Sequence, residues 1–170
     1  MPATRLNLGC GRKRIEDAVN VDVAKSVGPD VLCDLNRRPW PFTDDRFREV
    51  FAYDDVVATM EEIHRISGNG AILRITVPHF SCANTFTDPT HRHQFGWSSF
   101  DYFTGEHELS FYSAATFRRR ASRIVSFPTF VNKIVWRLAN RHPEAYERRW
   151  AWMFPAWFLY FELEVVKRPA

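Results

Sequence analysis

The sequence of 170 residues is long enough for one domain with a sizeable core. Its 45% hydrophobic and 25% charged residues are typical of a globular protein and exclude a disordered or fibrous chain. The net charge of +3 is small, and the basic residues come in scattered short groups, which gives no support for nucleic acid as a partner. We therefore expect a single domain over residues 1–170.

The cysteine content and the apolar runs of the sequence indicate the cellular compartment in which the protein is expected. Cys10, Cys33 and Cys82 are odd in number, widely spaced and without a CxxC pair, so we expect a reducing cytoplasm rather than a disulfide framework. No apolar signal region opens the sequence. The most apolar stretch, "WAWMFPAWFLYF" at 150–161, is too short to span a bilayer. We expect it to be a buried strand, with contact to a membrane surface as the alternative.

Short β-branched or alternating runs between turn signals predict strands in the first half of the chain. These strands are expected at residues 5–8, 19–23, 31–34, 47–53 and 71–77. Apolar residues at helical spacing predict one clear helix over 56–66, with Asp54 or Asp55 as its N-cap. The glycines of "SGNG" at 67–70 predict its C-cap.

The connections between the first strands are short. Residues 12–19 and 24–30 leave room for a helical turn or two at most, whereas a parallel crossover normally needs a dozen residues or more. Strands that alternate with crossovers and a helix nevertheless favour an α/β sheet.

The second half of the chain has less regular patterning. Residues 79–112 are polar and aromatic without sustained periodicity, and we expect a long functional insertion or lid there. Beyond it we expect a helix over 113–121 that begins at Ser113, a strand over 124–127, a helix over 131–140 and a closing strand over 158–166.

Glycines and acids follow the first three predicted strands. Gly9 and Gly11 come after the first strand, Asp22 ends the second and Asp34 ends the third. In a parallel sheet these carboxyl ends face one crevice, where glycine allows close approach and carboxylates accept hydrogen bonds from ribose or adenine. The order indicates a cofactor that contains adenosine. The dinucleotide fingerprint is incomplete because Arg14 occupies its third glycine position, and no P-loop sequence occurs.

The order of these motifs resembles the class I S-adenosylmethionine (SAM)-dependent methyltransferase family. "LNLGCG" is similar to its first motif, "VNVDV" to its second-strand acid, and "VLCDLNRRPWPFTDDRFREVFA" to its third-strand motif and fourth strand. "MEEIHRISGNGAILRITVPHF" resembles its late helix, glycine turn and fifth strand, and "FELEVVK" its final strand. The resemblance implies a Rossmann-like, mostly parallel sheet with an antiparallel last strand, shortened crossovers and a lid insertion over 79–112.

The resemblance also implies SAM as cofactor and a set of contacts to it. Gly9 and Gly11 would line the methionine portion, Asp22 would hold the ribose hydroxyls, and Asp34 with Leu35 would face the adenine. The full predicted cofactor-binding set is Asn7, Gly9, Cys10, Gly11, Asp22, Val23, Asp34, Leu35 and Tyr53.

The sequence departs from the family pattern in three places. An uncharged Asn7 stands where the first motif carries an acid, and the helix after the glycines is nearly absent. The turn after Tyr53 that in many relatives closes over the sulfonium is missing. A methyltransferase-like binding or scaffold protein without turnover is therefore the alternative to an enzyme.

The richest polar cluster is "PHFSCANTFTDPTHRHQF" at 78–95. His79, His91 and His93 are candidate catalytic residues, because imidazole titrates near neutrality and can take a proton from an acceptor hydroxyl. Asp88, His91 and His93 are also spaced to bind a divalent ion, although we assign no metal, and a capped turn with purely structural histidines is the third possibility. His64, within the predicted helix, is expected to be structural.

Similar D-P-T-H turns occur in relatives linked to sugar or glycan modification. We therefore expect O-methylation of a small hydroxylated or sugar-like acceptor. The aromatic residues that follow have two possible uses, stacking on a sugar or packing in the core. They are Phe95, Trp97, Phe100, Tyr102 and Phe103.

Overall fold

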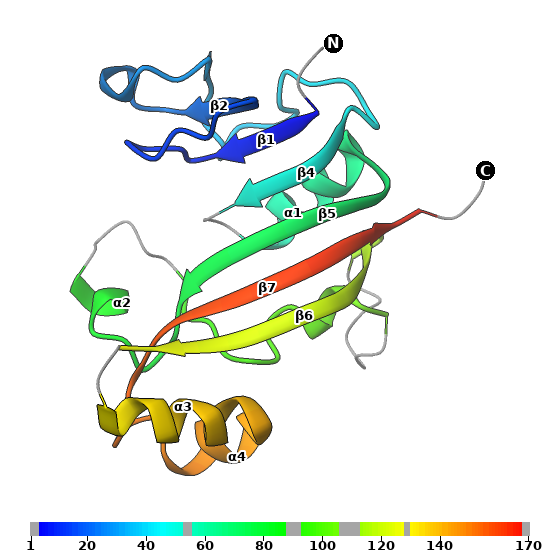
Figure 1. Ribbon diagram of the computed structural model, residues 1–170. Coiled ribbons are helices and arrows are strands. Elements are labelled where there is room, and N and C mark those ends of the chain that lie inside the picture. Colours follow the sequence, from blue (N-terminus) through cyan, green and yellow to red (C-terminus); the bar gives the residue numbers. More distant parts are fainter. Residues whose placement is uncertain (1–3, 53–55, 88–92, 106–112, 128–129, 168–170) are drawn as a thin grey trace.

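Seven strands form one sheet in the order β3-β2-β1-β4-β5-β7-β6 (Figure 1). The computed structural model describes residues 4–52, 56–87, 93–105, 113–127 and 130–167. The strands are β1 (Arg5–Leu8), β2 (Ala18–Asp22), β3 (Val31–Leu32), β4 (Phe47–Ala52), β5 (Ser67–Pro78), β6 (Thr116–Ser126) and β7 (Ala156–Val166). The helices are α1 (Val56–Ile66), α2 (Asn84–Thr87), α3 (Phe130–Arg141) and α4 (Pro143–Arg149), with 3-10 turns η1 (Lys25–Val27) and η2 (Asp101–Phe103).

Strand direction confirms the predicted sheet. β1 to β5 pair in parallel, whereas β7 runs antiparallel to both of its neighbours, β5 and β6. The five strands expected in the first half are all present, although β3 is only two residues long. The 24–30 connection contains only η1 and the 12–19 connection no helix, as their lengths predict.

The helix expected over 113–121 is wrong, because most of this segment belongs to β6. β6 pairs with β7 over its whole length, with Phe117 opposite Val165 and Ile124 opposite Leu159. Both Phe117 and Ile124 are buried in the core. Arginine-rich segments have good local helix propensity, but here pairing with a strand some forty residues later determines the structure.

Two further boundaries differ from expectation. "SGNG" at 67–70 does not cap α1; it opens β5, where Ser67 pairs with Phe47. A register shift follows between Phe47 and Glu49, and Gly70 has a φ of +77°, so the glycines form a bulge in the strand. The strand expected over 150–161 begins only at Ala156, because the preceding residues form a turn after the unpredicted helix α4.

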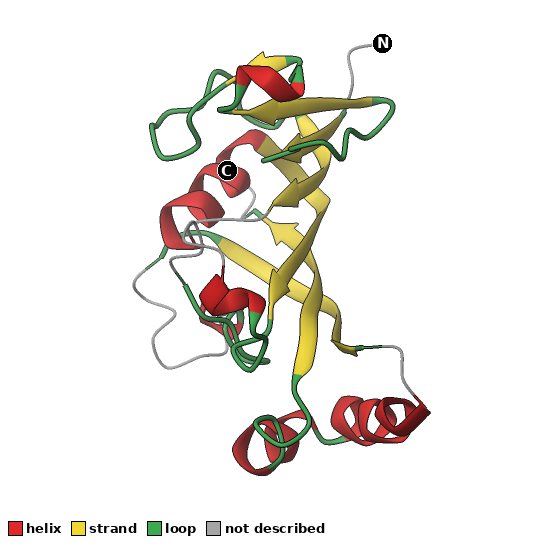
Figure 2. Cartoon of the chain, turned by 90° about the vertical axis from the view of Figure 1, so that its left-hand side faces the viewer, coloured by secondary structure: helices red, strands yellow, loops and turns green. Residues whose placement is uncertain are grey.

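The core lies on the face of the sheet that α1 covers (Figure 2). Leu6 and Leu8 of β1, Leu73 of β5 and Ile63 of α1 are fully buried there. Phe95, Phe100 and Phe103 of the 79–112 segment join the same core, and the Phe95 and Phe100 rings stack with centroids 5.7 Å apart. These three aromatic residues therefore pack in the core rather than lining an open surface.

The opposite face of the sheet carries a cross-strand ladder of charges. Glu49 of β4 pairs with Arg5 of β1 at 2.7 Å and with Arg74 of β5, and Arg74 pairs with Glu162 of β7 at 3.2 Å. Each charge alternates with buried apolar neighbours, as Arg74 does between Leu73 and Ile75. Parallel sheets usually have both faces covered by helices. Here short crossovers leave little chain for that role, and paired charges make the second face compatible with water.

We expect Glu49→Ala to lower the free energy of unfolding by about 1 kcal/mol or more, because it leaves Arg5 and Arg74 side by side without their shared carboxylate. Urea denaturation measures this change. Glu144→Ala, which removes the exposed pair with Arg148, is the matched control and should cost less than about 0.5 kcal/mol. Equal losses in the two variants would contradict a stabilising role for the ladder.

Candidate cofactor site

The loop after β1 has a backbone that only glycine adopts readily. Gly9 and Gly11 have φ angles of +61° and +48°, in the left-handed region. A Cβ atom built on either residue meets nothing within 4 Å, so open space lies beside the loop. Between them Cys10 is buried, and its N–H donates to the Val21 carbonyl at 3.0 Å. Burial raises the pKa of the Cys10 thiol, which therefore acts as a packing residue.

The Asp22 carboxylate connects the loops that follow β1 and β2. The Gly11 N–H donates to its Oδ2 atom and the Ala24 N–H to its Oδ1 atom, each at 2.8 Å. The Asp22 carbonyl accepts from the Cys33 N–H at 3.0 Å, which adds the end of β3. Each carboxylate oxygen can accept a second hydrogen bond. Asp22 thus positions the predicted site and retains acceptors for ligand hydroxyls.

Beyond Asp22, apolar and acidic side chains alternate along the edge. Val23 is 65% exposed. Asp34 Oδ1 accepts from the backbone and side-chain nitrogens of Asn36, and these bonds lower the pKa of Asp34. Leu35 packs against the core. Val23, Asp34 and Leu35 thus all follow the ends of β2 and β3, the part of the sheet at which adenosine contact was predicted.

A clamp from α1 holds the loop that follows Leu35. The Leu35 carbonyl accepts from Trp40 Nε1 at 3.2 Å, and the Trp40 backbone N–H donates to Glu62 Oε1 at 2.7 Å. Arg65 bonds Glu62 and the Phe42 carbonyl, and its hydrogen bond to Glu62 lowers the pKa of that buried carboxyl. The sequence reasoning did not include this clamp. The sequence indicates it only by an acid and a base three residues apart, Glu62 and Arg65 in "MEEIHR".

Asn7 turns into the protein rather than toward the open space. It is buried, and its Nδ2 atom donates to the Lys13 carbonyl at 3.0 Å and to Asn20 Oδ1 at 2.9 Å. Asn20 in turn bonds the Ile15 backbone and Asp30 Oδ2. Both amide protons of Asn7 are therefore used to fold the connection between β1 and β2, in place of the missing helix.

His79, a predicted catalytic residue, is fully buried just after β5. Its Nδ1 atom accepts from the Ser81 backbone N–H at 3.1 Å, and its Nε2 atom lies 3.2 Å from Glu147 Oε1. Glu147 also accepts the Trp97 backbone N–H at 2.6 Å. The geometry places His79 in a network that joins the 79–112 segment to α4, with both ring nitrogens engaged by the protein.

The other predicted catalytic and metal-binding residues lie in less completely described chain. His93 is exposed, with its ring 6.5 Å from that of Phe95. Asp88, His91 and Tyr53 lie outside the described residues, as do Asp54 and Asp55. Within the described ranges no group of three His, Cys, Asp or Glu residues is placed to hold a metal ion. Because Asp88 and His91 fall outside those ranges, the metal hypothesis for this cluster is untested.

The contacts of His64 confirm that this residue is structural. Its Nε2 atom lies 3.1 Å from the Val166 carbonyl, and its ring packs edge-on against Phe117 at a centroid distance of 5.6 Å. It therefore joins α1 to the end of β7 and contributes to packing rather than to a site.

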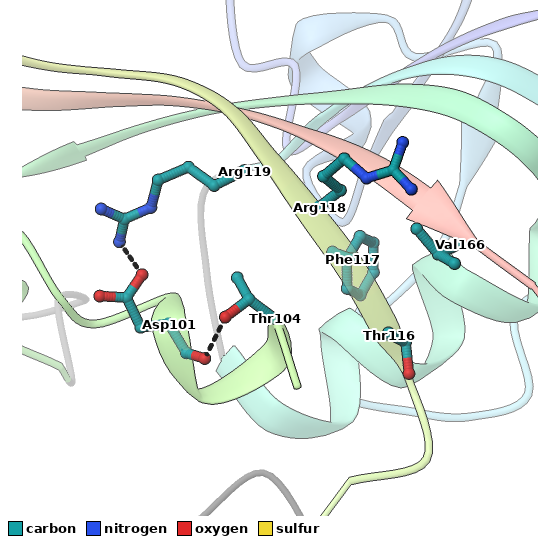
Figure 3. Close-up of a pocket in the computed structure, with 7 residues that line it drawn as sticks. All are labelled: Asp101, Thr104, Thr116, Phe117, Arg118, Arg119 and Val166. Atoms are coloured by element: carbon teal, nitrogen blue, oxygen red, sulfur yellow. Dashed lines mark hydrogen bonds and ion pairs between the residues drawn. The ribbon is translucent and has the colours of Figure 1, made fainter. Parts of the chain in front are cut away.

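A pocket of about 550 Å³ lies between η2 and the β6 edge, lined by Asp101, Thr104, Thr116, Phe117, Arg118, Arg119 and Val166 (Figure 3). Arg119 is directed at Asp101 and lies over the Trp97 ring at 5.4 Å. Thr116 pairs with Val166, where β7 ends, at the opposite edge of the sheet from the glycine loop. This pocket is therefore not part of the predicted cofactor site.

No helix in the described part of the chain is long and apolar enough to cross a membrane. The Cys10, Cys33 and Cys82 thiols are all free.

Comparison with known proteins supports the fold. No protein-family model and no curated protein matches the sequence. Among solved structures, a SAM-dependent methyltransferase from Mesorhizobium loti is similar at 14% identity and a TM-score of 0.57, over 96% of this chain and 93% of that one. Phosphoethanolamine N-methyltransferase 2 from Haemonchus contortus, in complex with SAM, aligns at 12% identity and a TM-score of 0.55, over 96% and 48%. The [4+2]-cyclase SpnF aligns at 16% identity and 0.56, over 96% and 74%.

The chain has the fold of class I SAM-dependent methyltransferases. The strand order, the single antiparallel strand and the solved neighbours agree on this point. At identities of 12–16% the comparisons establish the fold, and one neighbour named as a cyclase shares it, so the reaction has to be argued from the site.

Acid titration tests the loop network around Asn20. Asp30 accepts bonds from the Asn20 backbone and side chain and from Arg14, which lower its pKa from 3.8 to about 2. Because the folded-state pKa is depressed, the carboxylate stabilises the fold fully above pH 3.8, and this stabilisation is lost as the pH falls toward 2. The difference in unfolding free energy between wild type and Asp30→Asn should therefore shrink across that window in urea titrations. A difference independent of pH would contradict this role.

Proposed function

We propose that the protein is a SAM-dependent methyltransferase that O-methylates a small hydroxylated or sugar-like acceptor. The observation that carries the proposal is the Asp22 carboxylate, which holds Gly11 and Ala24 at the carboxyl edge of the sheet. Ligands of open α/β sheets bind at this edge. The fold shared with solved methyltransferases supports the same assignment.

The described residues fit SAM. The open space beside Gly9 and Gly11 suits the methionine portion, and the free acceptor capacity of Asp22 suits the two ribose hydroxyls. Val23 and Leu35 offer apolar contact for adenine, with Asp34 as the acceptor for its amino group. Asn7 and Cys10 contribute by shaping the loop rather than by contact, and Tyr53 stays in the proposed set.

The cofactor supplies an activated methyl group, so the protein has mainly to align the acceptor and exclude water. We assign the acceptor contact to the 79–112 segment, whose anchored parts fix its path next to the end of β5. A base is needed where the acceptor hydroxyl loses its proton early, and the exposed His93 and the neighbouring His91 are the proposed candidates. His79 is proposed as a positioning residue, because its ring nitrogens are engaged within the protein.

The second candidate function is a binding or scaffold protein with the methyltransferase fold but without turnover. The short segment after Tyr53 favours it, because relatives that close over the sulfonium have more chain there. Three free cysteines are consistent with a reducing compartment for either function, which we propose is the cytoplasm.

Asp22→Ala should weaken SAM binding about a hundredfold or more, because the variant loses both the ribose acceptors and the bonds that hold Gly11 and Ala24. Isothermal titration calorimetry measures the affinity. Asp17→Ala, an exposed acid on the preceding loop, is the matched control and should bind like the wild type. Unchanged affinity in Asp22→Ala would overturn the ribose assignment.

Methyl transfer from SAM to a panel of sugar nucleotides and phenols separates enzyme from scaffold. We expect at least one hydroxylated acceptor to be methylated, and His93→Ala to lower kcat about tenfold or more. His79→Gln should instead lower the unfolding midpoint, because it breaks the contacts to Ser81 and Glu147. Tight SAM binding with no acceptor methylated would favour the scaffold.

A further inference from the structure

The α3–α4 hairpin connects β6 to β7 and lies below β6 in the view of Figure 1. Its base is firmly attached. Asn140 Oδ1 accepts from the Ile124 N–H at 2.9 Å, and its Nδ2 atom donates to the Ile124 carbonyl at 2.8 Å. Inside the hairpin, the buried Tyr146 hydroxyl donates to the Phe154 carbonyl at 2.6 Å. These hydrogen bonds therefore hold the hairpin in a defined position.

The hairpin carries several exposed apolar side chains. Trp152 is 69% exposed, although its ring also meets that of Phe80 edge-on at a centroid distance of 5.5 Å, and Met153 beside it is 66% exposed. Ile134 and Leu138, one turn apart on α3, are 61% and 58% exposed. Leu138 and Trp150 also line a groove of about 440 Å³ between the helices. Exposed apolar clusters of this kind on otherwise polar proteins mark sites of interaction.

The same hairpin is cationic. Lys133, Arg137, Arg141, Arg148 and Arg149 are all exposed. Among the described residues only Arg148 of these five has an acidic partner, Glu144 at 3.7 Å. The second acid, Glu147, faces inward to the Trp97 N–H. The hairpin therefore combines exposed tryptophan, methionine and aliphatic side chains with an excess of positive charge.

We propose that the α3–α4 hairpin docks on the surface of an anionic lipid bilayer. Tryptophan rings favour the headgroup level of a membrane, and aliphatic side chains beside them enter the acyl boundary. Lysine and arginine add attraction to anionic headgroups, each by about fivefold in affinity. A second protein or a second copy of this chain would match the apolar cluster, but the largely unpaired cations favour a partner with fixed negative charge.

Docking has a defined direction relative to the sheet. β7 starts at Ala156, directly after the hairpin turn, and its residue Phe158 pairs with Pro78 at the end of β5. The hairpin thus lies near the end of the sheet at which β5 terminates with Pro78. Lipid binding itself involves no cofactor, so its test is independent of the proposed methyl transfer.

Flotation of the full chain with lipid vesicles tests the proposal. We expect binding to equimolar phosphatidylcholine–phosphatidylglycerol vesicles and little binding to phosphatidylcholine alone. The Trp152→Ser/Met153→Ser double variant should bind about tenfold more weakly, and Lys133→Gln/Arg137→Gln about twentyfold, with the latter loss reduced at high salt. All four positions are exposed, so thermal unfolding should be unchanged.

Leu32→Ser is the matched control, because Leu32 is 59% exposed on β3 at the opposite edge of the sheet, and it should bind vesicles like the wild type. Equal binding of the wild type to both vesicle types would overturn the proposal, and so would unchanged binding of the Trp152→Ser/Met153→Ser variant. Light scattering without lipid provides a further test. A dimer of the wild type that is absent in the Trp152→Ser/Met153→Ser variant would also overturn the proposal and assign the surface to self-association.

Discussion

The Asp22 carboxylate is the interaction on which the predicted site depends. Without helices of ordinary length after β1 and β2, the loops at this edge lack the usual framework, and Asp22 replaces part of it by accepting the Gly11 and Ala24 N–H groups. Asn7 and Asn20 replace the rest from inside the fold. The same short connections explain the charge ladder, because a sheet face that few helices cover needs paired charges in place of apolar side chains. The polar second face of the sheet is thus a consequence of the short connections.

Local patterns in the sequence were sufficient wherever an element's environment is local. The spacing of Met60, Ile63 and Ile66 predicted α1 with its observed bounds, because an amphipathic helix shows its buried face in its own sequence. The strand-end motif predicted the Gly9, Gly11 and Asp22 geometry, since parallel strands bring their carboxyl ends together. The end of β6 falls within the strand predicted over 124–127, but its first part was predicted to be a helix, because its structure comes from pairing with β7, a partner that local periodicity does not reveal. The inward turn of Asn7 and the Glu62 clamp were missed for a related reason, as each depends on a loop whose path is fixed by tertiary contacts.

The 79–112 segment shows how structural and functional demands share one stretch of chain. Its Phe95, Phe100 and Phe103 rings complete the core, and the buried His79–Glu147 contact ties it to α4. His93 of the same segment is exposed, and it belongs to the part that we propose for acceptor contact. The hairpin that holds Glu147 also carries exposed tryptophans and cations. The α3–α4 hairpin therefore both contacts the segment that we assign to the acceptor and carries the surface that we assign to lipid.

The most direct test of the account is a crystal structure of the protein with S-adenosylhomocysteine. We expect the ribose hydroxyls to bind the Asp22 carboxylate, the amino-acid portion to lie beside Gly9 and Gly11, and the adenine to lie between Val23 and Leu35. A ligand bound elsewhere, or an Asp22 carboxylate that makes only its two backbone contacts in the complex, would contradict it.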